Sequence, residues 1–182
     1  MILAIVAIVG ATAALQLGVI KDFQKDRLTT FLDPSHSTGP AHFTLQQSEI
    51  AIGAGGFSGR GYLQGTQTSL AFVPEQQTDF IFTVVGEEFG FVGAIVMLVL
   101  FLLVLWRAYR IALTSRDPFG TYLTIGIAAM FVIQIFVNVG MTMGIMPITG
   151  IPLPFISYGG SALIADFMAV GLLVSVHMRR QV

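Results

Sequence analysis

The sequence contains no cysteine and few charged residues, and these two shortages bound what the chain can be. Without cysteine there is neither a disulfide framework nor a thiolate metal site. Only 10% of the 182 residues are charged, whereas 54% are hydrophobic. An ordinary soluble domain carries about 25% charged residues. The composition therefore excludes that class and indicates a membrane protein.

Four stretches are long enough to cross a bilayer as helices, which takes about 20 apolar residues each. The spans that we expect are residues 2–20, 80–106, 121–141 and 161–177. A secretory signal peptide is the alternative for the first stretch. However, this stretch lacks the basic start and the clear cleavage site of a signal peptide. We therefore predict an all-α polytopic membrane protein with four transmembrane helices in a single membrane domain.

Arginines orient these spans. They fall in the loop at residues 107–120 and after the fourth span, at Arg107, Arg110, Arg116, Arg179 and Arg180. Two helices separate the groups, so both lie on the same side, which the positive-inside rule makes cytoplasmic. The loop at residues 21–79 and the segment at residues 142–160 are then extracellular. Both chain termini are expected in the cytoplasm.

The length of the extracellular loop indicates that it has a functional role, because compact proteins rarely keep a structureless loop of such length. Its residues 43–56 mix apolar and polar positions before a group of glycines, which predicts a short amphipathic helix on the outer leaflet. Gly59 and Gly61 flank Arg60, and glycines of this kind either form turns or let the backbone approach a ligand. Asp79 and Glu75 precede the second span, where carboxylates beside hydrocarbon indicate a site of chemistry.

The extracellular segment at residues 142–160 is expected to be re-entrant-like. Pro147, Pro152 and Pro154 prevent a regular helix. Irregular backbone at membrane depth is tolerated where it is buried in protein or lines a wet cavity, so this segment is expected in the outer mouth of the bundle.

Several polar residues lie inside the predicted spans, and each has two interpretations. Gln134 and Asn138 share one helix face, which fits either hydrogen bonding between helices or contact with a substrate. Asp166 fits a structural pair or a functional group equally well. Glu87 and Glu88 are adjacent and point about 100° apart on a helix.

Four strings along the chain resemble the SEDS family of bacterial wall synthesis (shape, elongation, division and sporulation). They are KDFQKDRLTTFLDP at 21–34, QQSEIAIGAGGFSGRGYLQGTQ at 46–67, FVPEQQTDFIFTVVGEEFGFVG at 72–93 and GIMPITGIPLPFISYGGSALIA at 144–165. The first string and GIPLPF are most similar to the rod-shape branch of the family. The family fold has about ten helices, of which this chain resembles the last four.

The resemblance implies a peptidoglycan glycosyltransferase of the bacterial cytoplasmic membrane that polymerises lipid II into glycan strands. The implied partners are lipid II, the nascent glycan, a class B penicillin-binding protein and other membrane proteins of the elongation complex, and no nucleic acid. The family's essential aspartate corresponds to Asp79 and its glycine-flanked basic residue to Arg60. Its SYGGS string corresponds to residues 157–161.

Glycan polymerisation needs a carboxylate that takes a proton from a sugar hydroxyl and positive charge for the leaving pyrophosphate. Asp79 is the expected base. The residues expected to bind substrate are Arg60, Lys21, Glu75, Gln67, Ser157, Tyr158 and Ser161. A divalent cation, Mg²⁺ or Mn²⁺, is another source of positive charge, and the sequence assigns it no ligands.

Three other functions use similar residues. A two-carboxylate hydrolase needs the same residue types. A lipid-precursor flippase or transporter would use polar residues within broken helices, although its essential groups would gather near the midplane. A non-catalytic scaffold for a penicillin-binding protein is the third.

Overall fold

The computed structural model describes residues 27, 30–31, 39–65 and 77–179. The expected span at residues 2–20 and the site candidates Lys21, Gln67 and Glu75 lie outside these ranges.

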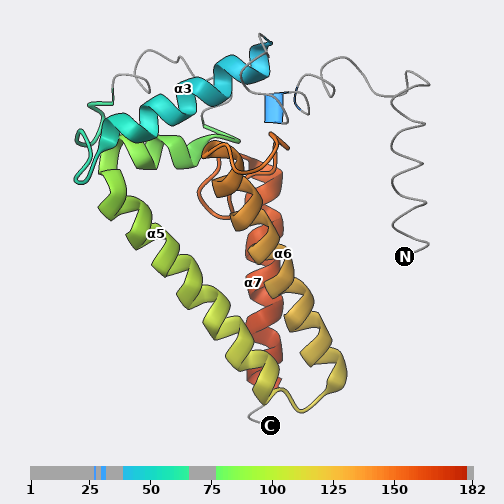
Figure 1. Ribbon diagram of the computed structural model, residues 1–182. Helices are drawn as coiled ribbons and strands as arrows, with labels where there is room; N and C mark the ends of the chain where they lie inside the picture. The colour runs from blue at the N-terminus through green and yellow to red at the C-terminus, as the bar shows by residue number, and fades with distance from the viewer. Residues whose placement is uncertain (1–26, 28–29, 32–38, 66–76, 180–182) are drawn as a thin grey trace, which may run out of the picture.

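The described chain is helical. Its long elements are α3 (Pro40–Gly55), α5 (Ile81–Thr114), α6 (Pro118–Thr142) and α7 (Gly160–Arg179). Three of them, α5, α6 and α7, are long and apolar enough to cross a membrane. The polytopic all-α class predicted from composition is therefore confirmed. Helix α3 lies across one end of the three long helices (Figure 1).

The helix expected at residues 80–106 is divided and longer than predicted. Gly90 has non-helical backbone angles (φ 64°, ψ −159°) inside α5. The arm before Gly90 runs alongside α3, and the remainder slants away toward the other end of the bundle (Figure 1). Glu87 and Glu88 therefore lie in the arm, ahead of the long spanning part of α5.

The break in α5 exposes backbone groups that a continuous helix would pair internally, and the turn after α3 pairs with them. Arg60 N donates to Glu87 O at 3.0 Å and Gly61 N donates to Glu88 O at 3.0 Å. On the other side of the break, the N–H groups of residues 91 and 92 donate to Gly56 O and Phe57 O at 3.0 and 3.2 Å. Unpaired groups of this kind are costly away from water, so the turn and the break stabilise each other.

A buried serine joins α3 to the bundle. Ser48 Oγ lies 2.7 Å from Thr83 Oγ1 on the arm of α5 and donates to Thr142 O, at the end of α6, at 2.8 Å. The helix predicted near residues 43–56 is thus present as α3 and fixed to both neighbouring helices.

At the opposite end the connection between α5 and α6 is shorter than the predicted loop at residues 107–120. Helix α5 continues to Thr114, and α6 begins at Pro118. The carboxylate of Asp117 accepts a hydrogen bond from Phe119 N at 3.3 Å and caps α6. Proline suits the first position of a helix because its missing N–H is not needed there.

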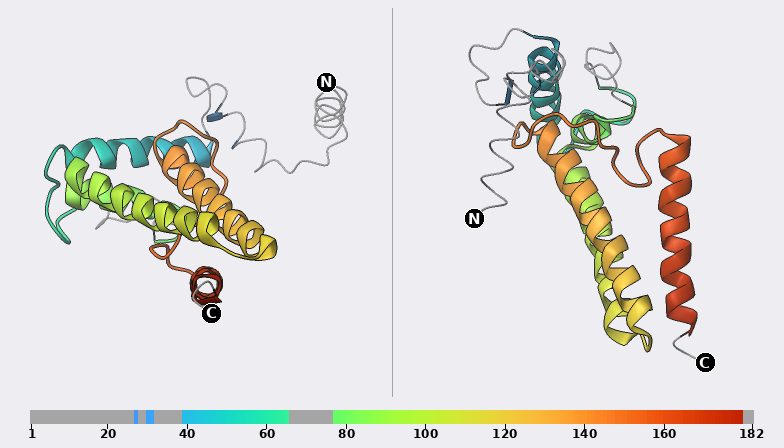
Figure 2. Two further views of the ribbon diagram at one scale, coloured as in Figure 1. Left: turned by 90° about the horizontal axis from the view of Figure 1, so that it is seen from below. Right: turned by 90° about the vertical axis from the view of Figure 1, so that its right-hand side faces the viewer.

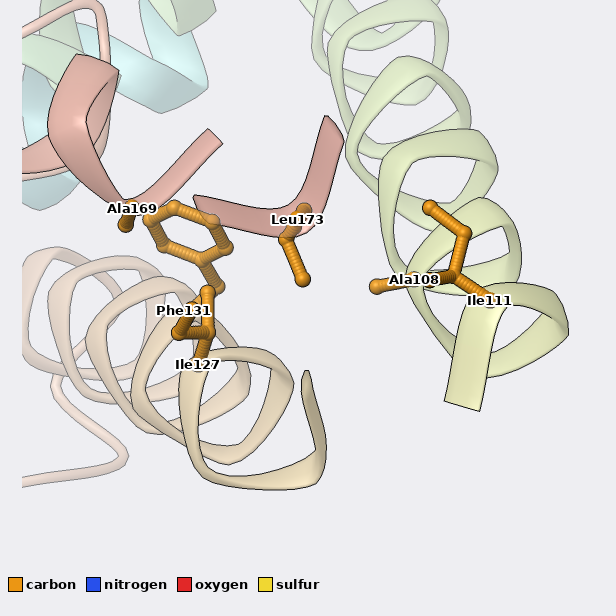
Figure 3. Packing of buried hydrophobic residues seen from close by; sticks show 6 residues of the cluster. All are labelled: Ala108, Ile111, Ile127, Phe131, Ala169 and Leu173. Atoms are coloured by element: carbon orange, nitrogen blue, oxygen red, sulfur yellow. The ribbon is translucent and has the colours of Figure 1, made fainter. Parts of the chain in front are cut away.

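One apolar cluster holds the three long helices together between their ends. It consists of Ala108, Ile111, Ile127, Phe131, Ala169 and Leu173, drawn in Figure 3. Helix α7 stands beside α6 and is joined to it by the irregular segment at residues 143–159 (Figure 2). Most of the remaining apolar side chains of these helices are exposed, as expected of surfaces that face lipid or further helices.

We name the two ends of the bundle by their residues. The acidic end carries Asp79, α3 and residues 143–159, and the arginine end carries Arg116 and Arg179 with the connection between α5 and α6 (Figure 1).

The first prediction concerns which side each end faces. The chain has no cysteine, so single cysteines introduced at Ser115 and Ser58 report cleanly on access. A membrane-impermeant maleimide should label Ser115→Cys only from the cytoplasm and Ser58→Cys only from outside, because arginines accumulate on cytoplasmic segments. Labelling of Ser58→Cys from the cytoplasm would invert the orientation.

The second prediction concerns the break. A Cβ added to Gly90 would overlap the backbone nitrogen of Gly59, and its backbone region is nearly confined to glycine. Gly90→Ala should lower the free energy of unfolding by more than about 1–3 kcal/mol, measured by thermal unfolding in detergent. The control is Gly126→Ala in α6, where a Cβ meets no atom within 4 Å. Equal stability of the two variants would show that the break does not require Gly90.

Candidate functional site at the acidic end

Asp79 lies in the turn that leads into α5, and it is partly accessible. The helix begins at Ile81 with Phe80 at the N-cap position, and no side chain makes a capping hydrogen bond there. The position of Asp79 is therefore not that of the N-cap residue. The turn is anchored by apolar contacts beneath it, because Phe80 packs with Leu45 of α3 and Ile148 in one buried cluster.

A guanidinium group lies next to the Asp79 carboxylate. Gly150 has a positive φ of 75°, and a Cβ built on it would lie 3.1 Å from Asp79 Oδ2 and 3.7 Å from Arg27 Nη1. Both charged groups therefore border the same small space above Gly150. Arg27 Nη1 also donates to Ile148 O at 3.3 Å, which fixes the guanidinium against residues 143–159.

Asn138 hydrogen-bonds the backbone segments that carry Asp79 and Gly150. Its Nδ2 atom donates to Asp79 O and to Ile151 O, each at 2.8 Å, and the residue is fully buried in α6. One amide group therefore joins the turn that carries Asp79 to the irregular segment that carries Gly150. The interpretation of Asn138 as a residue that hydrogen-bonds between elements is the one that this geometry supports.

The irregular segment is held in shape by two further polar side chains. Ser157 Oγ accepts a hydrogen bond from Leu153 N at 2.7 Å, and Asp166 Oδ2 of α7 accepts one from Phe155 N at 3.1 Å. Phe155 has a positive φ of 63°, a conformation that a bulky residue adopts only when its surroundings impose it. Asp166 thus makes a structural pair with this loop.

The candidates expected from the sequence occupy different places. Ser157 is buried in its turn, whereas Tyr158 and Ser161 are exposed. Tyr158 N donates to Gln77 O at 2.8 Å, which puts this residue beside the turn that carries Asp79. The structure therefore joins the backbone of the SYGGS string to the carboxylate's turn.

Arg60 is separated from Asp79 by the arm of α5. The arm, residues 81–89, is roughly 13 Å long at 1.5 Å per residue. The backbone nitrogen of Arg60 donates to Glu87 O at the far end of the arm, whereas Asp79 precedes its beginning. Arg60 Nε donates to Ala54 O at 3.2 Å, so the side chain also satisfies a carbonyl near the end of α3. The turn interpretation of the glycines around Arg60 accounts for these contacts.

Arg27 is a candidate that the sequence prediction missed, since Lys21 was chosen from the same string. The position of Arg27 depends on residues 148–150, which are far away in the chain. Within the described ranges, no group of three or more His, Asp or Glu side chains could hold a metal ion.

Together these features define a polytopic membrane protein with a carboxylate and a guanidinium at one membrane boundary. The chain belongs to the FtsW/RodA/SpoVE family, whose model, described as cell cycle protein, matches residues 1–182.

Relatives of known name agree with this assignment. The chain is 40% identical over 178 residues to the peptidoglycan glycosyltransferase MrdB of Escherichia coli K12, covering 98% of this chain and 48% of that protein. It is 44% identical to the peptidoglycan glycosyltransferase RodA of Treponema pallidum, covering 98% of this chain and 41% of the relative. Stage V sporulation protein E of Bacillus subtilis is 41% identical over 93% of this chain and 46% of its own length.

A solved structure is also similar. It comes from work on the coordination of polymerisation and crosslinking by a peptidoglycan synthase complex, and it matches with a TM-score of 0.76 and 33% identity. The match covers 98% of this chain and 48% of that one. The chain thus spans about half the length of the relatives it matches.

The third prediction tests the Asn138 bridge. Asn138→Leu removes both N–H donors and leaves the carbonyls of Asp79 and Ile151 without this partner, which should cost up to about 1–3 kcal/mol for each carbonyl. The matched control is Gln134→Leu, one turn away on α6, where the buried Oε1 atom has no hydrogen-bond partner among the residues that the structure describes. Thermal unfolding should separate the two variants by several degrees. Equal melting temperatures would contradict the bridge.

Proposed function

We propose that the protein to which this chain belongs is a peptidoglycan glycosyltransferase that polymerises lipid II during cell elongation and cell-shape control. The observation that carries the proposal is that Asp79 and Arg27 border one space at Gly150, at the acidic end of the bundle. Family membership and the names of the relatives support the reaction class.

The proposed reaction assigns a role to each charge. The Asp79 carboxylate takes the proton of the acceptor sugar hydroxyl as that oxygen forms a bond to the anomeric carbon of the donor sugar. The bond between this carbon and the lipid pyrophosphate breaks, and the electron pair leaves with the phosphate oxygen. Arg27 lies where a guanidinium would stabilise the growing negative charge through paired donors.

The partial accessibility of Asp79 suits this role, since the carboxylate must reach a substrate while its backbone stays fixed. Tyr158 and Ser161 are exposed near the same boundary and are proposed to contact the sugars. Arg60, at the far end of the α5 arm, is proposed to meet a more distant part of the substrate. Lys21, Gln67 and Glu75 remain proposed substrate contacts outside the described ranges.

A divalent cation would fit the same chemistry. Mg²⁺ is commonly bound through one or two carboxylates together with substrate phosphates, and Asp79 with the lipid pyrophosphate provides such donors. Bound Mg²⁺ or Mn²⁺ would add positive charge at the leaving group.

We propose that the protein lies in the bacterial cytoplasmic membrane. Its acidic end would face outward, and both chain termini would face the cytoplasm. Four described arginines at the other end support this orientation, namely Arg107, Arg110, Arg116 and Arg179. We propose a class B penicillin-binding protein as partner, because the similar solved structure belongs to work on a complex that couples polymerisation to crosslinking. Other membrane proteins of the elongation complex, and the nascent glycan, are proposed on the same basis.

A lipid flippase is the second candidate function, and a scaffold the third. A translocation path would need polar groups directed along the middle of the bundle. Asn138 and Asp166 instead hydrogen-bond the irregular segment at the acidic end, which favours the enzyme over the transporter. A scaffold would need no accessible carboxylate, so loss of polymerisation on substitution of Asp79 also separates the enzyme from the scaffold.

The fourth prediction addresses Asp79. In the complete protein, Asp79→Asn should lower the rate of lipid II polymerisation about 10²- to 10⁴-fold, which is the usual contribution of a general base. Asparagine keeps the shape of the side chain and still accepts hydrogen bonds through its Oδ1 atom, but it cannot take a proton from the sugar hydroxyl. The assay uses labelled lipid II and purified protein.

The matched control is Asp117→Asn at the arginine end, where the carboxylate caps α6. It removes the same charge and should leave polymerisation nearly unchanged. Near-normal polymerisation by Asp79→Asn would remove Asp79 from the mechanism and direct attention to Glu75.

A further inference from the structure

A cavity lies at the arginine end, far from Asp79. It has a volume of about 170 Å³ and lies between the loop after α5, the first turns of α6 and the last turns of α7. Arg116 and Arg179 line it from different segments, and Ser115 and Ser175 add hydroxyl groups. The proposed glycosyl transfer uses none of these residues.

The two arginines are available to a ligand. Both side chains are exposed, and neither guanidinium makes a hydrogen bond or an ion pair within the part of the chain that the structure describes. The one carboxylate in the lining, Asp117, accepts a hydrogen bond from Phe119 N at the start of α6. Two arginines against one carboxylate leave this cavity with an excess of positive charge.

The remaining walls of the cavity are apolar. The rest of the lining is formed by Phe119, Gly120 and Leu123 of α6 and by Leu172 and Val176 of α7. A ligand that fits such a cavity carries a negative group at one end and hydrocarbon at the other. The cavity is smaller than the 300–1,000 Å³ typical of sites that enclose a whole drug-sized molecule, so it would hold a headgroup while the tails remain outside.

Aromatic side chains near the cavity indicate that it lies at the level of the lipid headgroups. Trp106, Tyr109 and Tyr122 are exposed around this end of α5 and α6. Tryptophan and tyrosine gather at the level of the lipid headgroups. Arg110 lies over the Trp106 ring at 5.5 Å, as in cation–π pairs.

We propose that this cavity binds the phosphate group of an anionic glycerophospholipid, with Arg116 and Arg179 as the paired donors. Guanidinium groups suit phosphate because they present several donors in one plane, and basic pockets between membrane helices bind anionic headgroups. The bound lipid would join the end of α7 to the loop between α5 and α6, where the described helices share few other polar contacts.

The experiment measures lipid binding directly and does not depend on the proposed enzyme activity. The complete protein that contains this chain is purified and titrated by native mass spectrometry with phosphatidylglycerol and, separately, with phosphatidylcholine. A further titration adds inorganic phosphate as a soluble competitor. The test variant is Arg116→Gln/Arg179→Gln, and the control is Arg107→Gln/Arg110→Gln, which removes the same charge at the same end but outside the lining.

We expect the test variant to lose at least about tenfold in affinity for phosphatidylglycerol, since each arginine provides charge-assisted hydrogen bonds to the phosphate. The control should lose less than about threefold. Equal losses in both variants would overturn the proposal, because they would show attraction to the charged end as a whole. Equal binding of phosphatidylcholine, or full displacement by millimolar inorganic phosphate, would overturn the assignment to an anionic lipid.

Discussion

The break of α5 at Gly90 is the constraint on which the rest of the structure depends. A continuous helix would extend along the bundle and carry Asp79 away from α6 and the segment at residues 143–159. The break instead turns the first nine residues alongside α3, and the glycine turn at residues 56–61 pairs with the freed backbone groups. Gly59 must stay small for this pairing, because a Cβ there would overlap the carbonyl oxygen of Glu88. The arm then places Asp79 over Asn138.

The polar side chains within the bundle divide between structure and chemistry. Asn138, Ser157 and Asp166 all satisfy backbone groups of the irregular segment, which could not otherwise be buried at low cost. The charged groups of Asp79 and Arg27, by contrast, border a common space near Gly150. Rigid support beneath accessible charged groups is what an enzyme needs, since misplacement by about 1 Å costs much of the rate.

The sequence predicted the elements that depend on local pattern and missed those that depend on distant contacts. Apolar runs identified α5, α6 and α7, because a span needs only length and composition. The break at Gly90 was missed, since one glycine within an apolar helix is common and its stabilising partners lie some 30 residues earlier in the chain. Arg27 was missed for the same reason, because only the folded segment at residues 148–150 brings it to Asp79. Asp79 was selected from its position between a polar loop and a span and from the family resemblance, and its catalytic role stays a prediction.

We propose above all that lipid II binds at the acidic end, between Asp79, Arg27 and the segment around Gly150. The most direct measurement is photo-crosslinking of the complete protein with a lipid II analogue that carries a photoreactive group near its pyrophosphate, followed by mass spectrometry of the labelled peptides. The account predicts labelling of peptides that contain residues 27 and 148–151. Labelling concentrated on residues 115–123 at the arginine end, or on the middle of α6 around Gln134, would contradict it.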